Sequence, residues 1–374
     1  MSETLRILVS AGEHSGDQRA AGLLRAFCSR HQGVELKGLG GNALSSVGLR
    51  SEFDINALSV VGFAEVIRHL PFFRTVMGRM EKLLDEWKPH RVLLVDYPGF
   101  NLRFAKRVCK RGIPITYYIS PQIWAWGSGR MKLIQKSIDQ MLVLFPFEEE
   151  MYRRAGVRAE FVGHPLIDEV HPHVSDTEFR SSLDLPSDTR ILALLPGSRS
   201  QELSRHLPVM HAACSTLGDC VPVVGLASGL SSTMAERYAL RWTRNVYDLL
   251  ARSRGAVVAS GTATLETAIS GTPLIVVYKT NPISAALARR LIRIPYVAMV
   301  NVVAQERIVP ELLQSDFNAR NVSNHVRELI SDEEYRTRMK EGLNRVVRLL
   351  GSPGASERAA AALSERIKQQ PVYR

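Results

Sequence analysis

The stretch "VVASGTATLETAISGTPLIVV", residues 257–277, contains two short apolar runs separated by a small-residue turn and a helical pattern. The first run, Gly255 to Ala259, is bounded by glycine and is rich in β-branched residues, as is typical of a buried parallel strand. After the turn, Leu265, Ala268 and Ile269 recur at the spacing of one helix face. The segment therefore predicts a strand, a tight turn, a helix and a second strand, which together form a βαβ unit.

The turn Ser260-Gly261-Thr262 joins the first of these strands to the helix. In a βαβ unit the N–H groups of the helix's first turn point into the crevice at the carboxyl end of the strand, where they favour an anion such as a phosphate. Small residues in the turn let such a group approach closely. We therefore expect this junction to bind a phosphorylated ligand.

Glu266 lies four residues after Thr262, on the same helical face and one turn deeper. Its own neighbour four residues on is Ser270 rather than Lys or Arg, which weakens the common explanation of a helix glutamate, an ion pair along the helix. A carboxylate at this depth can accept hydrogen bonds from both ribose hydroxyls of a nucleotide. The alternative is a solvated glutamate on the surface of a helix.

A second loop of the same kind occurs in "LLPGSRSQE", residues 194–202, after another apolar run. Pro196-Gly197 predicts a turn, Ser198 can cap the next helix, and Arg199 offers a planar cation to a phosphate. A plain loop with a surface arginine is the alternative. Parallel strands of one sheet end at the same edge, so this loop and the Ser260 turn would face one crevice, and together they indicate a diphosphate.

Length and charge limit the classes of protein that this chain can belong to. Its 374 residues suggest two domains, and 45% hydrophobic with 23% charged residues is ordinary for a globular enzyme. The 48 basic and 37 acidic residues give a net charge of +11, which predicts an anionic partner: nucleic acid, phospholipid or a phosphorylated substrate. The four cysteines include no Cys-x-x-Cys pair, so we expect no zinc site, no disulfide framework and a reducing cytosol.

Short apolar runs alternate with helical patterns along the whole chain, which is typical of parallel sheets covered by helices. The alternation restarts after the polar stretch at residues 171–190. We expect two doubly wound domains, residues 1–168 and 169–350, followed by a helical tail at 351–374. The chain starts without a basic leader, and no apolar stretch of 18 residues occurs, so we expect neither export nor a membrane span.

Polar residues follow the first strand of the N-terminal domain in "SAGEHSGD", residues 10–17. Gly12 and Gly16 permit tight backbone, and Glu13, Ser15 and Asp17 bring polar groups to the carboxyl end of the strand. The motif is not a Gly-x-Gly-x-x-Gly fingerprint, so it does not favour a dinucleotide.

Asp96 ends the buried run Val92 to Val95 in "VDYPGFN", residues 95–101. An aspartate in this place either caps the turn ahead of Pro98 or acts as a base in the cleft, and the residues alone leave both interpretations open. His14 and His164 are further candidates, with structural hydrogen bonding as the alternative.

Two other stretches have both a structural and a functional interpretation. Trp124 and Trp126 precede basic residues and can stack on nucleic-acid bases, but packing at a domain edge is the interpretation that we favour. The apolar stretch Val60 to Met80 is either core or a surface that receives lipid chains at a membrane.

Nine motifs in series resemble the lipid-A-disaccharide synthase family, over residues 6 to 350. They are "SAGEHSGD", "KGLGGNAL", "DYPGFN", "SPQIWAW", "LFPFE", "FVGHPLID", "LLPGSRSQE", "SGTATLE" and "PYVAMVNVVAQERIVPELLQ". The resemblance implies an α/β chain of the GT-B type, with two Rossmann-like doubly wound domains that face each other across a cleft. The N-terminal domain would bind the acceptor and the C-terminal domain the UDP-sugar.

The activity that the resemblance implies is inverting transfer of 2,3-diacylglucosamine from UDP-2,3-diacylglucosamine to 2,3-diacylglucosamine 1-phosphate. The products would be UDP and a β-1,6-linked disaccharide 1-phosphate. No metal and no cofactor are implied, since side chains and helix N-termini can stabilise the leaving diphosphate.

The resemblance also implies roles for single residues. Asp96 is the candidate general base, with Glu13 and Asp17 as alternatives. Family members often read Asp-x-Pro-Asp-Phe-Asn, whereas Gly99 here leaves Asp96 as the only carboxylate of that motif. The residues expected to bind substrate are Gly12, Ser15, Gly16, Asn101, Ser198, Arg199, Ser260, Gly261, Thr262, Glu266 and Asn301.

We expect the partners to be the two acylated glucosamine substrates and the anionic inner membrane, touched peripherally from the cytoplasmic face, with no nucleic acid. The oligomeric state stays open, a homodimer included. Two other classes remain as alternatives: a UDP-N-acetylglucosamine 2-epimerase-like enzyme, which would share the fold and donor site, and a basic RNA-binding protein, which would not need Glu266 or Arg199 in a cleft.

Overall fold

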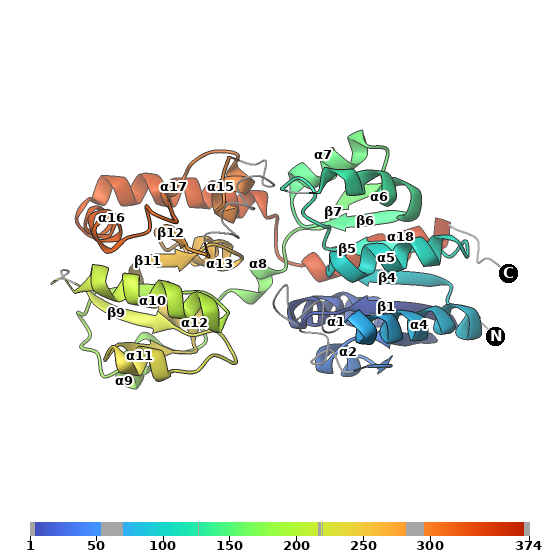
Figure 1. The fold of residues 1–374 in the computed structure, drawn as a ribbon, viewed down its shortest axis with the longest axis horizontal. Helices are drawn as coiled ribbons and strands as arrows, with labels where there is room; N and C mark the ends of the chain where they lie inside the picture. The colour runs from blue at the N-terminus through green and yellow to red at the C-terminus, as the bar shows by residue number, and fades with distance from the viewer. Residues whose placement is uncertain are drawn as a thin grey trace. The chain divides into compact units, whose positions relative to one another are not determined.

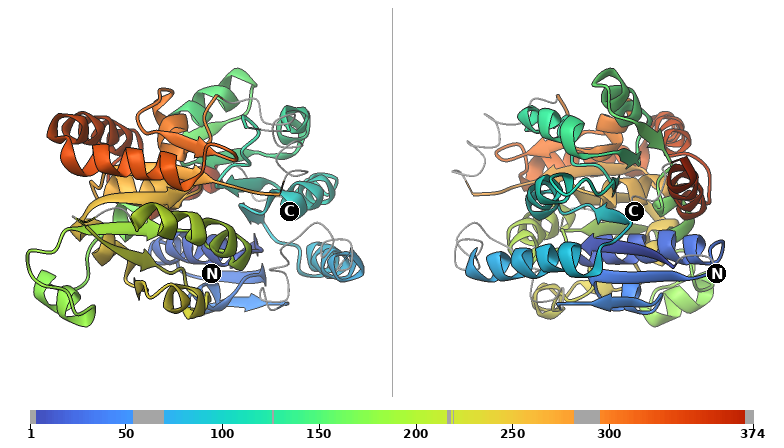
Figure 2. Two further views of the ribbon diagram at one scale, coloured as in Figure 1. Left: turned by 60° about the vertical axis from the view of Figure 1, so that its left-hand side comes forward. Right: turned by 90° about the vertical axis from the view of Figure 1, so that its right-hand side faces the viewer.

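The computed structural model describes residues 4–53, 70–125, 127–215, 218, 220–281 and 295–369. The chain forms two compact units (Figure 1). Unit 1 comprises Met1–Pro165 and Ser352–Arg374, and unit 2 comprises Leu166–Gly351. Each unit contains its own parallel sheet, and further views show helices on both faces of each sheet (Figure 2). The predicted α/β class with two Rossmann-like units is confirmed.

Unit 1 has, among its described residues, a seven-stranded sheet in the order β3-β2-β1-β4-β5-β6-β7. All neighbouring strands pair in parallel. The order reverses between β1 and β4, and ligands of such sheets bind at the carboxyl ends of the strands on either side of that switch point. The strands are β1 Leu5–Ala11, β2 Val34–Leu39, β3 Leu49–Ser51, β4 Arg91–Val95, β5 Ile115–Tyr118, β6 Gln140–Val143 and β7 Ala159–Phe161.

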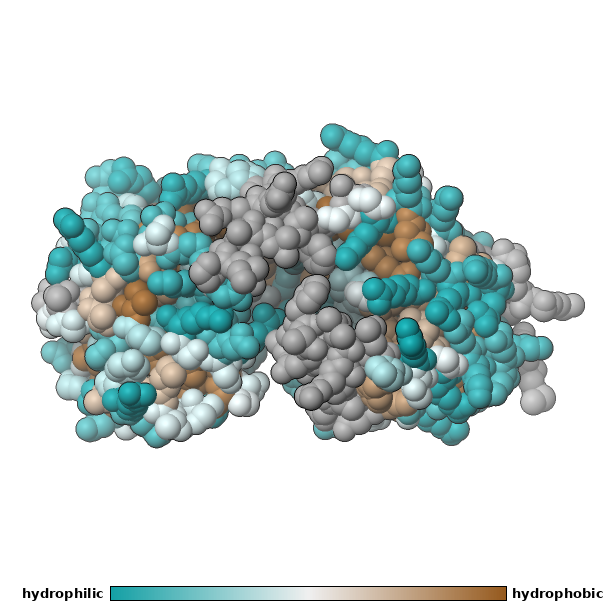
Figure 3. All heavy atoms as spheres, viewed as in Figure 1, coloured by the Kyte–Doolittle hydropathy of each residue, from teal (hydrophilic) through white to brown (hydrophobic). Residues whose placement is uncertain are grey.

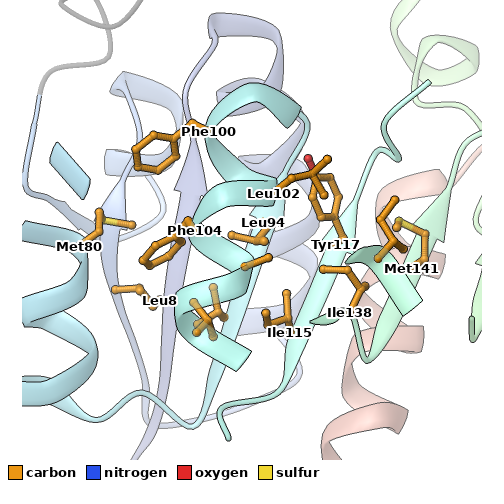
Figure 4. Close-up of a cluster of buried hydrophobic side chains, with 14 of the residues drawn as sticks. Leu8, Met80, Leu94, Phe100, Leu102, Phe104, Ile115, Tyr117, Ile138 and Met141 are labelled. Atoms are coloured by element: carbon orange, nitrogen blue, oxygen red, sulfur yellow. The ribbon is translucent and has the colours of Figure 1, made fainter. Parts of the chain in front are cut away.

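The helices of unit 1 bury apolar side chains against this sheet. Phe100 and Phe104 lie one turn apart on α5 and point to the side on which Met80 of α4 lies (Figure 4). The described helices are α1 His14–Cys28, α2 Asn42–Ser45, α4 Leu70–Trp87, α5 Pro98–Cys109, η2 Ser128–Arg130, α6 Met131–Ser137, α7 Pro146–Arg154 and α18 Ala355–Gln369.

The C-terminal helix α18 lies in the part of the chain expected to form a helical tail, residues 351–374, and it groups with unit 1. Ala359, Ala360 and Leu363 are fully buried, which gives this helix an apolar face. The Gln140 amide donates to the Ala362 carbonyl at 3.0 Å, and the Arg366 guanidinium donates to Asp139 at 3.0 Å. These contacts return the end of the chain to the N-terminal sheet. The boundary between unit 1 and unit 2 falls after Pro165, and the expected end of the first domain was residue 168.

Unit 2 has, in its described part, a six-stranded sheet in the order β10-β9-β8-β11-β12-β13. Its strands also pair in parallel, and the order reverses between β8 and β11. The strands are β8 Ile191–Leu195, β9 Val221–Gly225, β10 Arg241–Thr243, β11 Ser253–Ala259, β12 Leu274–Tyr278 and β13 Glu311–Leu313.

Helices connect these strands and cover both faces of the second sheet. Those that the structure describes are α8 Leu166–Glu169, α9 Asp176–Ser182, α10 Ser200–Cys214, α11 Thr233–Arg237, α12 Val246–Arg252, α13 Ala263–Ile269, α15 Met299–Ala304, α16 Ala319–Ser331 and α17 Glu333–Leu349. The predicted strand–turn–helix–strand segment is confirmed as β11, α13 and β12.

The apolar stretch Val60 to Met80 lies partly outside the described residues, because the description resumes at residue 70. Within α4, Val76 and Met80 are fully buried and Met77 is nearly so, so this part belongs to the core. Phe72 and Phe73 are only partly buried. No helix in the described part of the chain is both long and apolar enough to span a bilayer.

Trp124 packs inside unit 1, whereas Trp126 lies outside the described residues. The Trp124 indole donates to a carboxylate oxygen of Glu148 at 3.0 Å, and its ring meets Phe147 edge to face. Ser120 donates to the same oxygen of Glu148 at 2.8 Å. Burial raises the pKa of Glu148 to about 7, against the lowering effect of these donors. The Trp124 indole is therefore used within the fold.

Candidate functional site

A cavity of about 720 Å³ lies at the switch point of unit 2, where β8 and β11 end side by side. This volume is in the usual range for small-ligand pockets. The six residues that the sequence predicts for a nucleotide diphosphate all line it. They are Ser198, Arg199, Ser260, Gly261, Thr262 and Glu266.

The turn after β8 is shaped by Gly197 and Glu202. Gly197 has a φ of +124°, and a Cβ built there would lie 2.4 Å from a carboxylate oxygen of Glu202, so only glycine fits. Glu202 accepts a hydrogen bond from the Ser198 N–H at 3.0 Å and pairs with Arg199 at 3.6 Å. Arg199 is the N-cap residue of α10 and its side chain is 60% exposed, so its guanidinium can reach a ligand.

The turn after β11 presents small residues to the cavity. Gly261 has a φ of +148°, and a Cβ built there would meet nothing within 4 Å, so the space beside the backbone is open. The Ser260 hydroxyl donates to the Val297 carbonyl at 2.9 Å, which anchors the turn. Glu266 lies one turn into α13 and is half-buried. Its side chain lines the same cavity as Arg199.

Sequence reasoning missed part of this cavity. Its lining also includes His173, Arg244 and Tyr247, and the rings of His173 and Tyr247 lie 6.2 Å apart. The His173 N–H donates to the buried Asp248 carboxylate at 3.1 Å, which holds the segment before α9 against α12. The stretch around His173 is polar and shows no strand or helix pattern, so its place beside the cavity depends on the long-range contact with Asp248.

Asn301 does not line this cavity. It is fully buried, and its amide donates to the Val309 carbonyl and to Glu311, each at 2.9 Å. Its oxygen accepts the N–H groups of Ile308 and Val309 at 2.8 and 3.0 Å. Because every donor and acceptor of this side chain is used internally, its contacts stabilise the loop after α15.

The end of β4 in unit 1 has an unusual backbone. Asp96 and Tyr97 have φ values of 46° and 49°, the left-handed region that non-glycine residues rarely adopt. Two side chains hold this conformation: the Asn101 amide and the Tyr117 hydroxyl donate to the Asp96 carbonyl at 2.8 and 2.6 Å. Such strained residues cluster at functional sites, where the surrounding structure maintains them.

Asn101 is fully buried and joins the ends of the two central strands. Its amide also donates to the carbonyls of Ser10 and Val95, at 3.2 and 3.1 Å. The Ser10 hydroxyl donates to the Asn101 oxygen at 2.7 Å. The side chain predicted to bind substrate is therefore engaged in fixing the Asp96 backbone.

Of the two glycines of the first motif, packing requires only Gly12 to be glycine. A Cβ at Gly12 would lie 2.3 Å from the Tyr97 ring, so glycine is what lets that ring lie against the end of β1. Gly16 is buried beside Val95, and a Cβ built at Gly16 would lie 3.8 Å from the Val95 side chain. Glu13 and Ser15 are exposed at the start of α1.

Asp17 is only 1% exposed and caps the next helix from a distance. Its carboxylate accepts the backbone N–H groups of Gly41, Ala43 and Leu44 at 2.6, 3.0 and 3.2 Å. This carboxylate is used inside the unit, so Asp96 and Glu13 remain as carboxylates that can meet a substrate.

Burial raises the pKa of Asp96, and the positive charge of Arg19 opposes that increase. Arg19 lies on α1, two residues beyond the motif that sequence reasoning considered, and it was missed. His164 is 2% exposed, and burial together with Arg19 lowers its pKa to about 3, so this histidine is neutral near pH 7. Among the described residues, no cluster of three or more His, Cys, Asp and Glu side chains suits a metal ion.

Two Rossmann-like units, each with its own parallel sheet, are the architecture of the GT-B fold class. Solved structures of this fold include a putative UDP-N-acetylglucosamine 2-epimerase from Listeria monocytogenes, with a TM-score of 0.66, 13% identity, and 99% of this chain and 98% of that one covered. They also include the calicheamicin glycosyltransferase CalG4, with a TM-score of 0.61, 16% identity, and 98% and 99% covered.

Sequence comparison identifies the family within that class. The family described as lipid-A-disaccharide synthetase matches residues 7–365. The lipid-A-disaccharide synthase of Syntrophus aciditrophicus is 40% identical over 97% of this chain and 98% of its own length, and that of Trichlorobacter lovleyi is 36% identical over the same shares. This chain belongs to the lipid-A-disaccharide synthetase family. It is a glycosyltransferase of lipid A biosynthesis.

The Asn101 network predicts a graded loss of stability. Asn101→Ala removes four hydrogen bonds and leaves the partner groups buried, so it should lower the free energy of unfolding by about 2–4 kcal/mol. Ser10→Ala removes one side-chain bond and should lower it by about 1 kcal/mol. Urea unfolding measures both. Equal losses in the two variants would show that Asn101 does not hold the end of β4.

Proposed function

We propose that the cavity of unit 2 binds the UDP group of UDP-2,3-diacylglucosamine. Arg199 and the Ser260-Gly261-Thr262 turn hold the diphosphate, and the Glu266 carboxylate accepts hydrogen bonds from the ribose hydroxyls. The observation that carries this proposal is the convergence of both predicted loops and Glu266 on one cavity of about 720 Å³. His173 and Tyr247 line the same cavity and offer rings on which the uracil can stack.

We propose that Asp96 is the general base of the transfer. The acceptor's 6-hydroxyl oxygen forms a bond to the donor's anomeric carbon while the bond from that carbon to the diphosphate oxygen breaks. Asp96 takes the hydroxyl proton, and UDP leaves with the electron pair of the broken bond. The strained backbone at Asp96, its half-buried side chain and its raised pKa support this assignment.

A base that is held rigidly needs little reorganisation during the reaction. Asn101 and Tyr117 fix the Asp96 backbone, and the Tyr97 ring is fixed against Gly12. Exposed Glu13, at the start of α1, is the carboxylate that would replace Asp96 in this role if Asp96 is not the base.

Glu266→Ala should weaken UDP binding at least about tenfold, because hydrogen bonds to a charged group contribute roughly 1.5–3 kcal/mol. Isothermal titration calorimetry with UDP measures the loss. Glu202→Ala is not a suitable control, since Glu202 shapes the Ser198 turn. Glu357→Ala, on α18 of unit 1, makes the same change outside the cavity and should leave UDP affinity unaltered. Normal affinity in Glu266→Ala would contradict the ribose role.

Asp96→Asn should lose about 10²–10⁴-fold in turnover while it still binds UDP. The assay is UDP release from UDP-2,3-diacylglucosamine in the presence of the acylated glucosamine 1-phosphate. Wild type should release no UDP and form no epimer from UDP-N-acetylglucosamine, which separates this reaction from that of an epimerase. Near-normal turnover in Asp96→Asn would transfer the role of base to Glu13.

The pH dependence tests the same assignment. A base works in its deprotonated form, so activity is lost as the pH falls through its pKa. Because burial raises the pKa of Asp96, the acid limb of the pH–activity profile should lie at higher pH than an aspartate with an ordinary pKa would give. Arg19→Gln removes the charge that lowers this pKa and should move the limb to higher pH. An unmoved limb would mean that another group titrates.

We further propose that the enzyme contacts the anionic inner membrane peripherally, from the cytoplasmic face. Acylated substrates reside in membranes, and the net charge of +11 supports attraction to anionic lipids, at about 1 kcal/mol per basic residue near the surface. Salt should screen this attraction. Wild type should co-sediment with anionic liposomes at low salt, less at high salt, and little with neutral liposomes. Equal sedimentation with anionic liposomes at low salt, anionic liposomes at high salt and neutral liposomes would contradict an electrostatic contact.

A further inference from the structure

The loop that follows β5 starts beside the proposed base. The Asp96 N–H donates to the Tyr118 carbonyl at 3.0 Å, and the Tyr117 hydroxyl donates to the Asp96 carbonyl at 2.6 Å. Ile119, the next residue, has a φ of 65°, which is rare for a β-branched side chain. Because β4 and β5 are parallel, the loop Ser120 to Ala125 leaves β5 at the edge of the sheet where Asp96 follows β4.

Glu148, on helix α7, holds this loop by hydrogen bonds. Its Oε1 accepts from the Ser120 hydroxyl at 2.8 Å and from the Trp124 indole N–H at 3.0 Å. One turn further along α7, the Tyr152 hydroxyl donates to the Pro121 carbonyl at 3.2 Å. Helix α7 follows β6, the neighbour of β5 in the sheet. A single helix therefore fixes the course of the loop at both of its ends.

Glu148 is a buried carboxylate without a cation. It is 2% exposed, whereas hydrophilic side chains cover much of the surface of unit 1 on the face seen in Figure 3. In the part of the chain that the structure describes, it forms no ion pair. Burying a carboxylate is unfavourable, and burial raises the pKa of Glu148 although its donors lower it. Packing alone does not require a carboxyl here, whereas holding Ser120 and Trp124 requires an acceptor.

We propose that Glu148 is a positioning residue for the transfer: through Ser120 and Trp124 it holds the loop after β5 as a wall of the acceptor site beside Asp96. This inference rests on the proposed function, because it takes the acceptor to meet its base at the end of β4. Within the loop Gln122 is exposed and Trp124 is half-buried, so both have surface that can meet a ligand. A loop held in one course keeps the acceptor's hydroxyl near the base.

Removing the acceptor oxygen tests this role. Glu148→Ala should lower kcat/KM for the acylated glucosamine 1-phosphate by about 10–100-fold, because a misplacement of about 1 Å can cost about 10²-fold. The KM for this acceptor should rise and kcat should fall, while UDP affinity stays that of wild type. Glu148→Gln keeps an oxygen that can accept from Ser120 and Trp124, so it should retain most of the activity. Steady-state UDP release at varied acceptor concentration measures these constants.

Coupling between Glu148 and the loop is the second test. Ser120→Ala removes one of the two donors and should lower kcat/KM for the acceptor by a smaller factor than Glu148→Ala. In the Glu148→Ala background it should cause no further loss, because two residues that act through one contact are not additive. Ser120→Ala leaves Glu148 and its second donor in place, so it tests the same contact if Glu148→Ala fails to fold.

Thr116→Val is the matched control for a loss of stability alone. Thr116 is fully buried near the start of β5, at the opposite edge of the sheet. Its hydroxyl accepts from Arg91 at 2.8 Å and donates to Gln140 at 3.1 Å, so the variant also loses two buried hydrogen bonds. It should lower the urea midpoint of unfolding, as Glu148→Ala does, and keep the acceptor KM and kcat of wild type.

The outcomes separate this inference from the proposed function. Should wild type release no UDP with the acylated acceptor, the proposed function itself fails. Should wild type be active while Glu148→Ala is less stable but keeps its acceptor kinetics, Glu148 serves the fold alone and the inference fails. It also fails if Thr116→Val loses as much kcat/KM, if Glu148→Gln is as defective as Glu148→Ala, or if the Ser120 and Glu148 losses multiply. A loss confined to acceptor kinetics, with Glu148→Gln active, supports the proposal.

Discussion

The side-chain amide of Asn101 ties together the ends of β1 and β4, the two strands at which the order of the first sheet reverses. It uses both hydrogens and its oxygen on Ser10, Val95 and Asp96, at distances of 2.7 to 3.2 Å. Two consecutive left-handed residues are costly, at roughly 1–3 kcal/mol each, and this network offsets that cost. The left-handed backbone of Asp96 and Tyr97 at the end of β4 is therefore held from inside the unit.

In unit 2, buried polar side chains likewise hold the loops at the ends of the strands by hydrogen bonds to their backbone. His206 is fully buried, and it accepts the Lys279 N–H at 3.0 Å through Nε2, so Nδ1 carries the proton that is donated to the Pro196 carbonyl at 2.7 Å. This links the turn after β8 to the end of β12. Asp248 holds the segment of His173 in a similar way. Rigid loops of this kind present polar groups without reorganisation when a ligand binds.

The fold by itself does not distinguish a transferase from an epimerase. A UDP-N-acetylglucosamine 2-epimerase from Neisseria meningitidis, solved with UDP-N-acetylglucosamine bound, shares the fold at a TM-score of 0.65 but only 10% of the sequence. Relatives at 34–40% identity over nearly the full length are lipid-A-disaccharide synthases. Function is carried by sites built on a shared scaffold, so the sequence relatives identify the family where the fold does not.

Local patterns in the sequence determined the two sheets and the chemistry of their loops. The apolar runs before Asp96 and before Pro196 are the strands Arg91–Val95 and Ile191–Leu195, because a short apolar run that ends at turn residues is a local signal. The turn residues after two of these strands likewise predicted that Arg199 and the Ser260 turn lie at the same carboxyl edge of the second sheet. Helix α5 begins at Pro98, although proline and glycine in its first turn weaken the helical signal of the sequence.

Only the tertiary structure decided which polar side chains line a cavity and which make hydrogen bonds inside the fold. Asp17, Asn101 and Asn301 stand in motifs that suggest binding, yet each is buried and bonded to backbone inside its unit. For Asp17 and Asn101 that backbone lies 24 and 91 residues away. His173 joins the cavity of unit 2, and α18 returns to unit 1, through partners more than 70 residues away. Such outcomes depend on how distant elements pack, and no local periodicity or turn signal encodes that packing.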